Sequence, residues 1–261
     1  MAVPLTLPSH AAAIAPLKLW RPRWFDGVAL VVGSAAPDFA YALQPYATIR
    51  AHRWWALIWF CVPVTLAITR LVRAVAAEVA ANLPGVWRDY RVLATSRHRW
   101  FVTAGCAWLS AVTHRLWDMV THASIDQGAI HFAWLSDTAV AGQPWWRVLH
   151  YGSTMFGAVA VAWCVADVGR RGLLLRWHPP VTDALAPRPR RFWTAAVIVW
   201  AVGVAVQPIL AGWTQTQILF VRLLAIFALG LVAGAITVRT SGPDAPAPTG
   251  TSRSLRASRT R

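Results

Sequence analysis

Long apolar stretches alternate with short polar connections along most of the chain. Six of these stretches approach or exceed the ~20 residues that a helix needs to cross the hydrocarbon core of a membrane: 26–44, 54–72, 100–120, 151–169, 192–212 and 216–238. Helices are expected because a lipid-exposed backbone must satisfy its own hydrogen bonds. The pattern therefore predicts an all-α protein, a polytopic transmembrane helical bundle of about six spans.

The pattern stops near the C-terminus. Residues 1–238 are predicted to form the integral membrane domain, whereas residues 239–261 combine Pro, Ser, Thr and Arg without apolar periodicity. A segment of this composition cannot bury enough apolar surface to fold by itself. We expect residues 239–261 to be a disordered basic tail.

Basic residues gather in the connections on one side of the predicted spans. The segment before the first span, the connections 70–99 and 170–191, and the tail together hold 20 of the 25 Lys and Arg residues. The opposite connections carry only Arg50, Arg53 and Arg147. Cytoplasmic loops carry the excess of Lys and Arg in membrane proteins, so both termini are predicted to be cytoplasmic.

Composition agrees with a membrane protein and argues against other classes. Hydrophobic residues make up 57% of the chain and charged residues 13%, which is too apolar for an ordinary soluble domain. The net charge of +15 comes from arginines between apolar runs, so topology explains it better than a nucleic-acid partner does. Cys61, Cys106 and Cys164 are scattered singly and indicate neither a disulfide framework nor a thiolate metal site.

Ionisable residues interrupt the apolar stretches at positions that the predicted topology brings to one membrane edge. Charged groups within spans are costly and mark functional sites. These residues lie at the outer ends of the first and third spans, at the entry to the second, and in the connection before the fourth. They are Asp38, His52, His114, Asp118, His122 and His150.

The stretch SAVTHRLWDMVTH spaces His114, Asp118 and His122 four residues apart. In a helix, such positions drift by only ~40° per step, so the three side chains share one face. Imidazole and carboxylate groups together are suitable ligands for zinc, and for manganese or iron in mixed sites. Three other interpretations stay open: a polar packing cluster on the third span, a capping role for Asp38, and a place for His52 in the interfacial aromatic belt.

Four segments carry a resemblance to a known family. LTLPSHAAAIAPL, LVVGSAAPDFAYAL, LSAVTHRLWDMVTH and YGST resemble an uncharacterised family of bacterial integral membrane proteins, over roughly residues 4–160. The order His, Asp, His, His-xxx-Asp, His is also similar to that of zinc-dependent phospholipase C, the related single-strand nucleases and membrane-bound metal-dependent hydrolases. This similarity implies a divalent metal, with zinc as the first choice. The ligands that it implies are His10, Asp38, His52, His114, Asp118, His122 and His150. Thr154 stands where those enzymes carry a glutamate, which puts a three-metal cluster in doubt.

His10 conflicts with the predicted topology. The charge bias places the N-terminus inside, whereas the other expected ligands are outside. Either an N-terminal re-entrant helix brings His10 to the site, or His10 is not a ligand. A re-entrant segment is tolerated only where protein or a cavity covers its backbone.

The expected function is that of a membrane-embedded, metal-dependent hydrolase acting on a phosphoester at the outer face of a bacterial cytoplasmic membrane. Asp38 and Asp118 are the expected catalytic residues, which hold a metal pair together or orient the attacking water. Thr121, Ser153 and Thr154 are expected to fix imidazole tautomers. A site at this depth predicts a membrane lipid or lipid-linked partner.

Two other classes use the same residues. The first is a metal-handling or proton-coupled transport protein without hydrolytic activity, in which the His/Asp cluster is a transport site. The second is a scaffold whose polar cluster packs helices and binds no metal. Metal analysis of the purified protein separates the scaffold from the other two classes.

Overall fold

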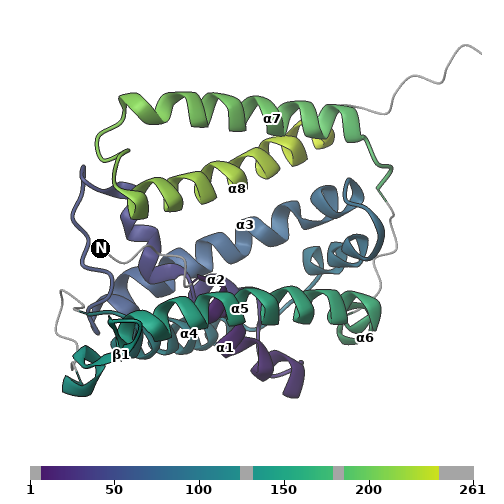
Figure 1. Cartoon of the computed structure of the whole chain (residues 1–261). Coiled ribbons are helices and arrows are strands. Elements are labelled where there is room, and N and C mark those ends of the chain that lie inside the picture. The colour runs from purple at the N-terminus through teal and green to yellow at the C-terminus, as the bar shows by residue number, and fades with distance from the viewer. Residues whose placement is uncertain (1–6, 124–131, 179–184, 241–261) are drawn as a thin grey trace, which may run out of the picture.

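Four long helices run across the computed structural model, which describes residues 7–123, 132–178 and 185–240 (Figure 1). They are α3 (Val62–Ala81), α5 (Trp145–Arg170), α7 (Pro189–Val206) and α8 (Thr216–Thr240). A fifth long helix, α4 (Trp100–Thr121), packs beside α5. The all-α prediction is confirmed for the described residues, apart from the short antiparallel pair β1 (Thr138–Val140) and β2 (Gln143–Pro144).

Short helical elements fill the space between the long helices. Near the N-terminus these are α1 (Leu7–Trp20), α2 (Gly27–Gly33) and the 3-10 helix η1 (Ala36–Leu43). A π-helical turn, η2 (Leu57–Cys61), leads directly into α3. The connections contain η3 (Gly85–Ala94), η4 (Ala133–Ser136), α6 (Leu173–Trp177) and η5 (Gln207–Ile209).

Four segments are long and apolar enough to cross a membrane within the described part of the chain. They are Leu57–Ala81, Trp145–Arg170, Pro189–Ile209 and Thr216–Thr240. These segments correspond to the second, fourth, fifth and sixth predicted spans. The chain is therefore built as a membrane protein, although the first and third predicted spans are not among the four.

The first predicted span, 26–44, is not one continuous helix. α2 ends at Gly33, and η1 begins at Ala36 with Pro37 near its start. Proline disfavours the α conformation in the residue before it and removes a backbone donor, which favours a break here. The break places Asp38 in the first turn of η1, where the side chain is buried.

The two ends of the chain bear on two further predictions. The expected tail lies outside the described residues from 241 onward, and α8 continues through Thr240, past the predicted boundary at 238. α1 has 14 residues and a length of about 21 Å, which is shorter than the ~30 Å hydrocarbon core. α1 alone therefore does not cross a membrane.

Two glycines allow the short helices to approach the long ones closely. A Cβ atom at Gly157 of α5 would lie 2.3 Å from Cα of Ser9, so only glycine permits α1 to lie against α5 here. A Cβ atom at Gly33 would lie 2.9 Å from the carbonyl oxygen of Ala107 on α4. Small residues at such crossings are typical of helix packing in membranes.

Asp26 fixes the turn between α1 and α2. Its carboxylate accepts hydrogen bonds from Arg73 of α3 and from Thr103 of α4, both at 2.7 Å. It also accepts a 3.3 Å bond from the backbone N–H of Ala29 and so caps α2. One buried carboxylate thus ties α2 to both neighbouring long helices.

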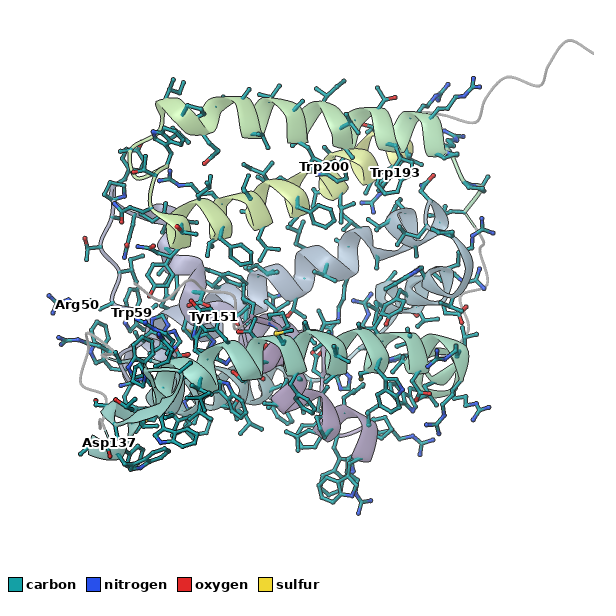
Figure 2. The ribbon with its side chains drawn as sticks, in the orientation of Figure 1. Arg50, Trp59, Asp137, Tyr151, Trp193 and Trp200 are labelled. Atoms are coloured by element: carbon teal, nitrogen blue, oxygen red, sulfur yellow. The ribbon has the colours of Figure 1, made fainter. Side chains whose placement is uncertain are left out.

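α7 and α8 form a hairpin at one side of the bundle (Figure 1), and α8 contacts η1. Arg222 of α8 donates to the carbonyl oxygens of Ala42 at 3.1 Å and Ala211 at 2.9 Å, and also to that of Gln44. The buried guanidinium therefore joins the end of η1 to the α7–α8 connection. Figure 2 shows Arg50 at the same end of the long helices and Trp193 toward the other.

Candidate metal centre

Histidines and aspartates from five parts of the chain meet at one end of the long helices. α1 supplies His10, η1 supplies Asp38, and the turn before η2 supplies His52. α4 supplies His114 and Asp118 near its C-terminal end and is followed at once by His122. His150 lies near the start of α5. Every predicted ligand is described, and all except His122 are buried.

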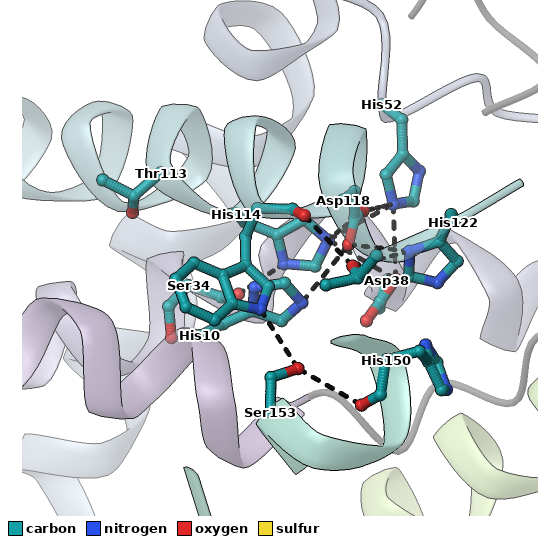
Figure 3. Close-up of polar contacts among 12 residues, drawn as sticks. His10, Ser34, Asp38, His52, Thr113, His114, Asp118, His122, His150 and Ser153 are labelled. Atoms are coloured by element: carbon teal, nitrogen blue, oxygen red, sulfur yellow. Dashed lines mark hydrogen bonds and ion pairs between the residues drawn. The ribbon is translucent and has the colours of Figure 1, made fainter. Parts of the chain in front are cut away.

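Asp118 is the centre of the arrangement (Figure 3). Its Oδ2 atom lies 3.0 Å from Nε2 of His114 and 3.5 Å from Nε2 of His52. Its Oδ1 atom lies 3.5 Å from Nε2 of His10 and 3.4 Å from Nδ1 of His122. The two carboxylate oxygens therefore face two different pairs of histidines.

Asp38 completes the group on the Oδ2 side. Its Oδ1 atom lies 3.3 Å from Nε2 of His52 and 3.8 Å from Nε2 of His114, and these two nitrogens are 3.3 Å apart. Donor atoms about 2.0–2.1 Å from a tetrahedral zinc ion are roughly 3.3 Å from one another. The separations of the two imidazole nitrogens from each other and from the two carboxylate oxygens, 3.0–3.8 Å, are thus close to those of ligands around one ion. We call these four atoms the first ligand set.

A backbone carbonyl selects the tautomer of His114. Nδ1 of His114 lies 2.6 Å from the carbonyl oxygen of Ser34, which can only accept a hydrogen bond. Nδ1 therefore carries a proton, and in the neutral ring Nε2 is the unprotonated nitrogen that faces Asp38 and Asp118. An imidazole that donates from one nitrogen to a carbonyl and binds a cation through the other is the usual arrangement in metal sites. The close crossing at Gly33 places Ser34 within reach.

His10 and Oδ1 of Asp118 have unsatisfied polar atoms. The two ring nitrogens of His10 and the Oδ1 atom of Asp118 are buried, and none of the three makes a hydrogen bond within the described residues. The His10 ring stacks on His114 with centroids 3.8 Å apart. Buried polar atoms without a hydrogen bond are costly, and a cation bound between Nε2 of His10 and Oδ1 of Asp118, which are 3.5 Å apart, would satisfy both atoms. The residues therefore fit a second cation beside Oδ1 of Asp118.

α1 brings His10 into the cluster, with Nε2 3.5 Å from Oδ1 of Asp118. That His10 is a metal ligand, and that α1 re-enters the membrane, stay predictions. Asp38, His52, His114, Asp118 and His122 also lie together.

His122 is oriented by Thr121. The Thr121 hydroxyl donates to the carbonyl of Trp117 at 3.0 Å, so its lone pairs face Nδ1 of His122, also at 3.0 Å. Nδ1 of His122 thus lies between the Thr121 hydroxyl and Oδ1 of Asp118, which is 3.4 Å away. Thr121 therefore contacts an imidazole nitrogen of the site, and its role in fixing the tautomer stays a prediction.

His150 lies further from the centre. Its ring contacts the His122 ring edge to face, with centroids 5.0 Å apart, and Figure 3 shows it beyond His122. Thr154 and Ser153 both donate to the backbone carbonyl of His150, at 2.7 and 3.2 Å. The Ser153 hydroxyl also accepts a 3.4 Å hydrogen bond from Nε1 of Trp117. The roles of Ser153 and Thr154 in fixing imidazole tautomers stay predictions.

Arg115 is a buried residue next to the site that the sequence did not single out. It follows His114 directly, and its side chain is fully buried. Within the described residues, none of its three guanidinium nitrogens has a hydrogen-bond partner, and its charge lies over the ring of Trp54 at 5.6 Å. The available signal was an arginine inside an apolar stretch that also carries two expected ligands.

Comparison with known protein families identifies one match. A model for a domain of unknown function, DUF4184, matches residues 3–239, which is most of the chain. The protein therefore belongs to this family. Comparison with curated proteins and with solved structures gives no match.

Proposed function

We propose that this member of the DUF4184 family is a membrane-embedded, metal-dependent hydrolase that cleaves a phosphoester. The observation that carries the proposal is the position of Asp118, whose two oxygens face separate histidine pairs at 3.0–3.5 Å. A carboxylate placed in this way is suited to bridge two cations. Sites with two metal ions about 3.5–4 Å apart are typical of enzymes that act on phosphoesters.

The donor types favour zinc among the divalent metals. The first ligand set offers two imidazole nitrogens and two carboxylate oxygens, which zinc commonly binds and which manganese and iron also accept. Two buried carboxylates also need compensating positive charge, because an unpaired buried ion is costly. When bound, divalent cations activate a water molecule near neutral pH and neutralise charge on the phosphoryl oxygens.

The two aspartates have different contacts and hence different proposed roles. Asp118 has both oxygens directed at histidines and holds the two sets of donors together. Asp38 contacts histidines through Oδ1. Its Oδ2 is then the oxygen that orients the attacking water and accepts its proton.

The location of the site suggests the substrate. His114 lies seven residues before the end of α4, which is about 10 Å inside the helix end, and His150 lies near the start of α5. The site is thus one to two helical turns inside the end of the bundle, next to helices that are apolar enough to cross a membrane. A phosphate attached to a lipid would sit at this depth, so we propose a lipid-linked phosphoester at the outer face.

The test uses the full chain purified in detergent. Zinc content is measured first, and hydrolysis is then measured with a water-soluble phosphomonoester, a water-soluble phosphodiester, phosphatidic acid and phosphatidylglycerol. We expect bound zinc, release of product from a lipid substrate, and loss of both metal and activity in His114→Ala. Asp167→Asn, at the far end of α5, is the matched control and should retain both.

Each outcome has a distinct meaning. Bound zinc without hydrolysis of any phosphoester would contradict the enzyme and favour a metal-handling or transport protein. Absence of zinc, manganese and iron from the wild-type protein, also after incubation with each metal, would leave only a packing role for the cluster.

A further inference from the structure

Arg115 is a buried charged residue whose guanidinium donors have no acceptor among the described residues. Arginine stays charged in proteins, and its planar guanidinium carries five N–H donors. The side chain is fully buried, and no hydrogen bond to any of its nitrogens exists within the described residues. A buried charge without hydrogen bonds strongly destabilises a fold.

The contact with Trp54 compensates only part of the cost of burying the Arg115 side chain. The guanidinium carbon lies 5.6 Å from the centre of the indole ring, within the range of a cation–π interaction. Such an interaction uses the face of the ring and satisfies none of the in-plane N–H donors. The donors of Arg115 therefore still lack acceptors.

The position of Arg115 connects it to the metal centre. It follows His114 and precedes Asp118 by three residues, about one helical turn, and the Asp118 carboxylate interacts electrostatically with it. Trp54 lies two residues after His52, so both neighbours of the guanidinium come from segments that carry ligands of the first set.

Charge also favours an anion at this position. Two divalent cations would bring four positive charges, against two negative charges from Asp38 and Asp118. Arg115 adds one more positive charge. The site as proposed is therefore strongly positive and is completed by an anionic ligand.

We infer that Arg115 is the phosphoryl-binding residue of this site and donates hydrogen bonds to oxygens of the substrate phosphate. This inference rests on the proposed function. A guanidinium suits the task because its fork of donors matches two phosphoryl oxygens at once. The residue touches the group that reacts, and its charge is balanced when the substrate is bound.

The experiment measures the binding of inorganic phosphate to the zinc-loaded full chain in detergent, by calorimetry and by the rise in thermal unfolding temperature. The variants are Arg115→Met, Arg115→Lys and, as a matched control, Arg147→Met. Arg147 is an arginine at the same end of the bundle that donates to Gln143 at the surface. Trp54→Ala tests the ring contact separately.

We expect Arg115→Met to weaken phosphate binding by at least about tenfold, because hydrogen bonds to charged groups contribute that much or more. Arg115→Lys should recover part of the loss, since it restores the charge without the fork of donors. Zinc content should stay at the wild-type level in both variants. Arg147→Met should bind phosphate as the wild type does, and Trp54→Ala, which leaves the donors of Arg115 in place, should weaken phosphate binding less than Arg115→Met does.

Stability gives an independent readout. Replacing a buried, unpaired charge by an apolar side chain of similar length is neutral or stabilising. Arg115→Met without phosphate should thus unfold at the wild-type temperature or above it. A variant that fails to fold, or that keeps wild-type phosphate affinity, would overturn the inference.

The two proposals fail in different ways. If the wild-type protein binds no metal, the proposed function is wrong irrespective of Arg115. If zinc binds and phosphoesters are hydrolysed while Arg115→Met binds phosphate normally, only the inference on Arg115 is wrong.

Discussion

Asp118→Asn is the sharpest perturbation of the candidate metal centre. The substitution keeps the size of the side chain but replaces one carboxylate oxygen by an NH2 group and removes the charge. In the protein, Oδ2 faces His52 and His114 while Oδ1 faces His10 and His122. An amide has one acceptor oxygen, so asparagine can serve only one of the two sides. On the other side, the NH2 group of asparagine faces the position where a cation would be bound.

The magnitude follows from this geometry. Changing a residue that merely orients a metal ligand costs 10–100-fold in metal affinity. Asp118 is placed as a direct ligand on both sides, so the loss should exceed about 100-fold, or roughly 2.7 kcal/mol, at the side that meets the amide nitrogen. The wild-type chain should bind two zinc ions at saturation, and the variant one at most.

The assay is zinc titration against a competing chelator, with the zinc content of the dialysed protein as a second measurement. Asp167→Asn removes a carboxylate that pairs with Arg171 at the far end of α5, and it should leave zinc binding unchanged. Wild-type stoichiometry in Asp118→Asn, with affinity within about threefold, would refute the bridging role of Asp118.

Three further predictions test how the site is held. Gly157→Ala should reduce zinc affinity without changing a ligand, because its Cβ would meet the backbone of α1 at 2.3 Å, whereas Gly152→Ala, with open space around it, should not; zinc titration compares the two. Arg222→Gln should lower the free energy of unfolding by about 3 kcal/mol or more, because three carbonyls lose a charged donor. The surface variant Arg147→Gln should lower it by about 0.5 kcal/mol or less. Denaturant unfolding in detergent measures both. Burial lowers the pKa of His178 from 6.5 to about 4, so the folded protein excludes a proton that the unfolded chain binds, and stability should fall as pH drops from 6.5 toward 4. His178→Gln should flatten that part of the curve of unfolding temperature against pH.

Local periodicity made part of the site predictable. His114, Asp118 and His122 lie on one α-helix and just beyond its end, so their spacing alone determines that their side chains meet. The four apolar helices followed from hydropathy for the same reason, since length and composition are properties of one segment. The association of Asp38 and His52 with this face was expected only from topology, and the observed contacts support it.

Long-range packing decided what periodicity could not. The place of His10 depends on whether α1 lies against α5, and that contact is made possible by Gly157, far away in the sequence. The break before η1 was hidden because Ser34, Ala35 and Ala36 are small and interrupt no apolar run. Arg115 was missed because burial is a property of the folded chain, and its neighbours in sequence drew attention to ligands instead.

α8 and its connection to α7 help to hold η1 in place through Arg222. Its guanidinium donates to the carbonyls of Ala42 and Gln44 at the end of η1, and Asp38 lies in the first turn of the same short helix. The hydrogen bonds of a 3-10 helix have poorer geometry than those of an α-helix, so we expect the direction of Asp38 to depend on how the far end of η1 is held. Arg222 is not one of the ligands, but its replacement should change the position of Asp38 and thereby weaken metal binding. Zinc affinity in Arg222→Gln should therefore fall at the first ligand set, which contains Asp38, and hold at the side of Asp118 that faces His10.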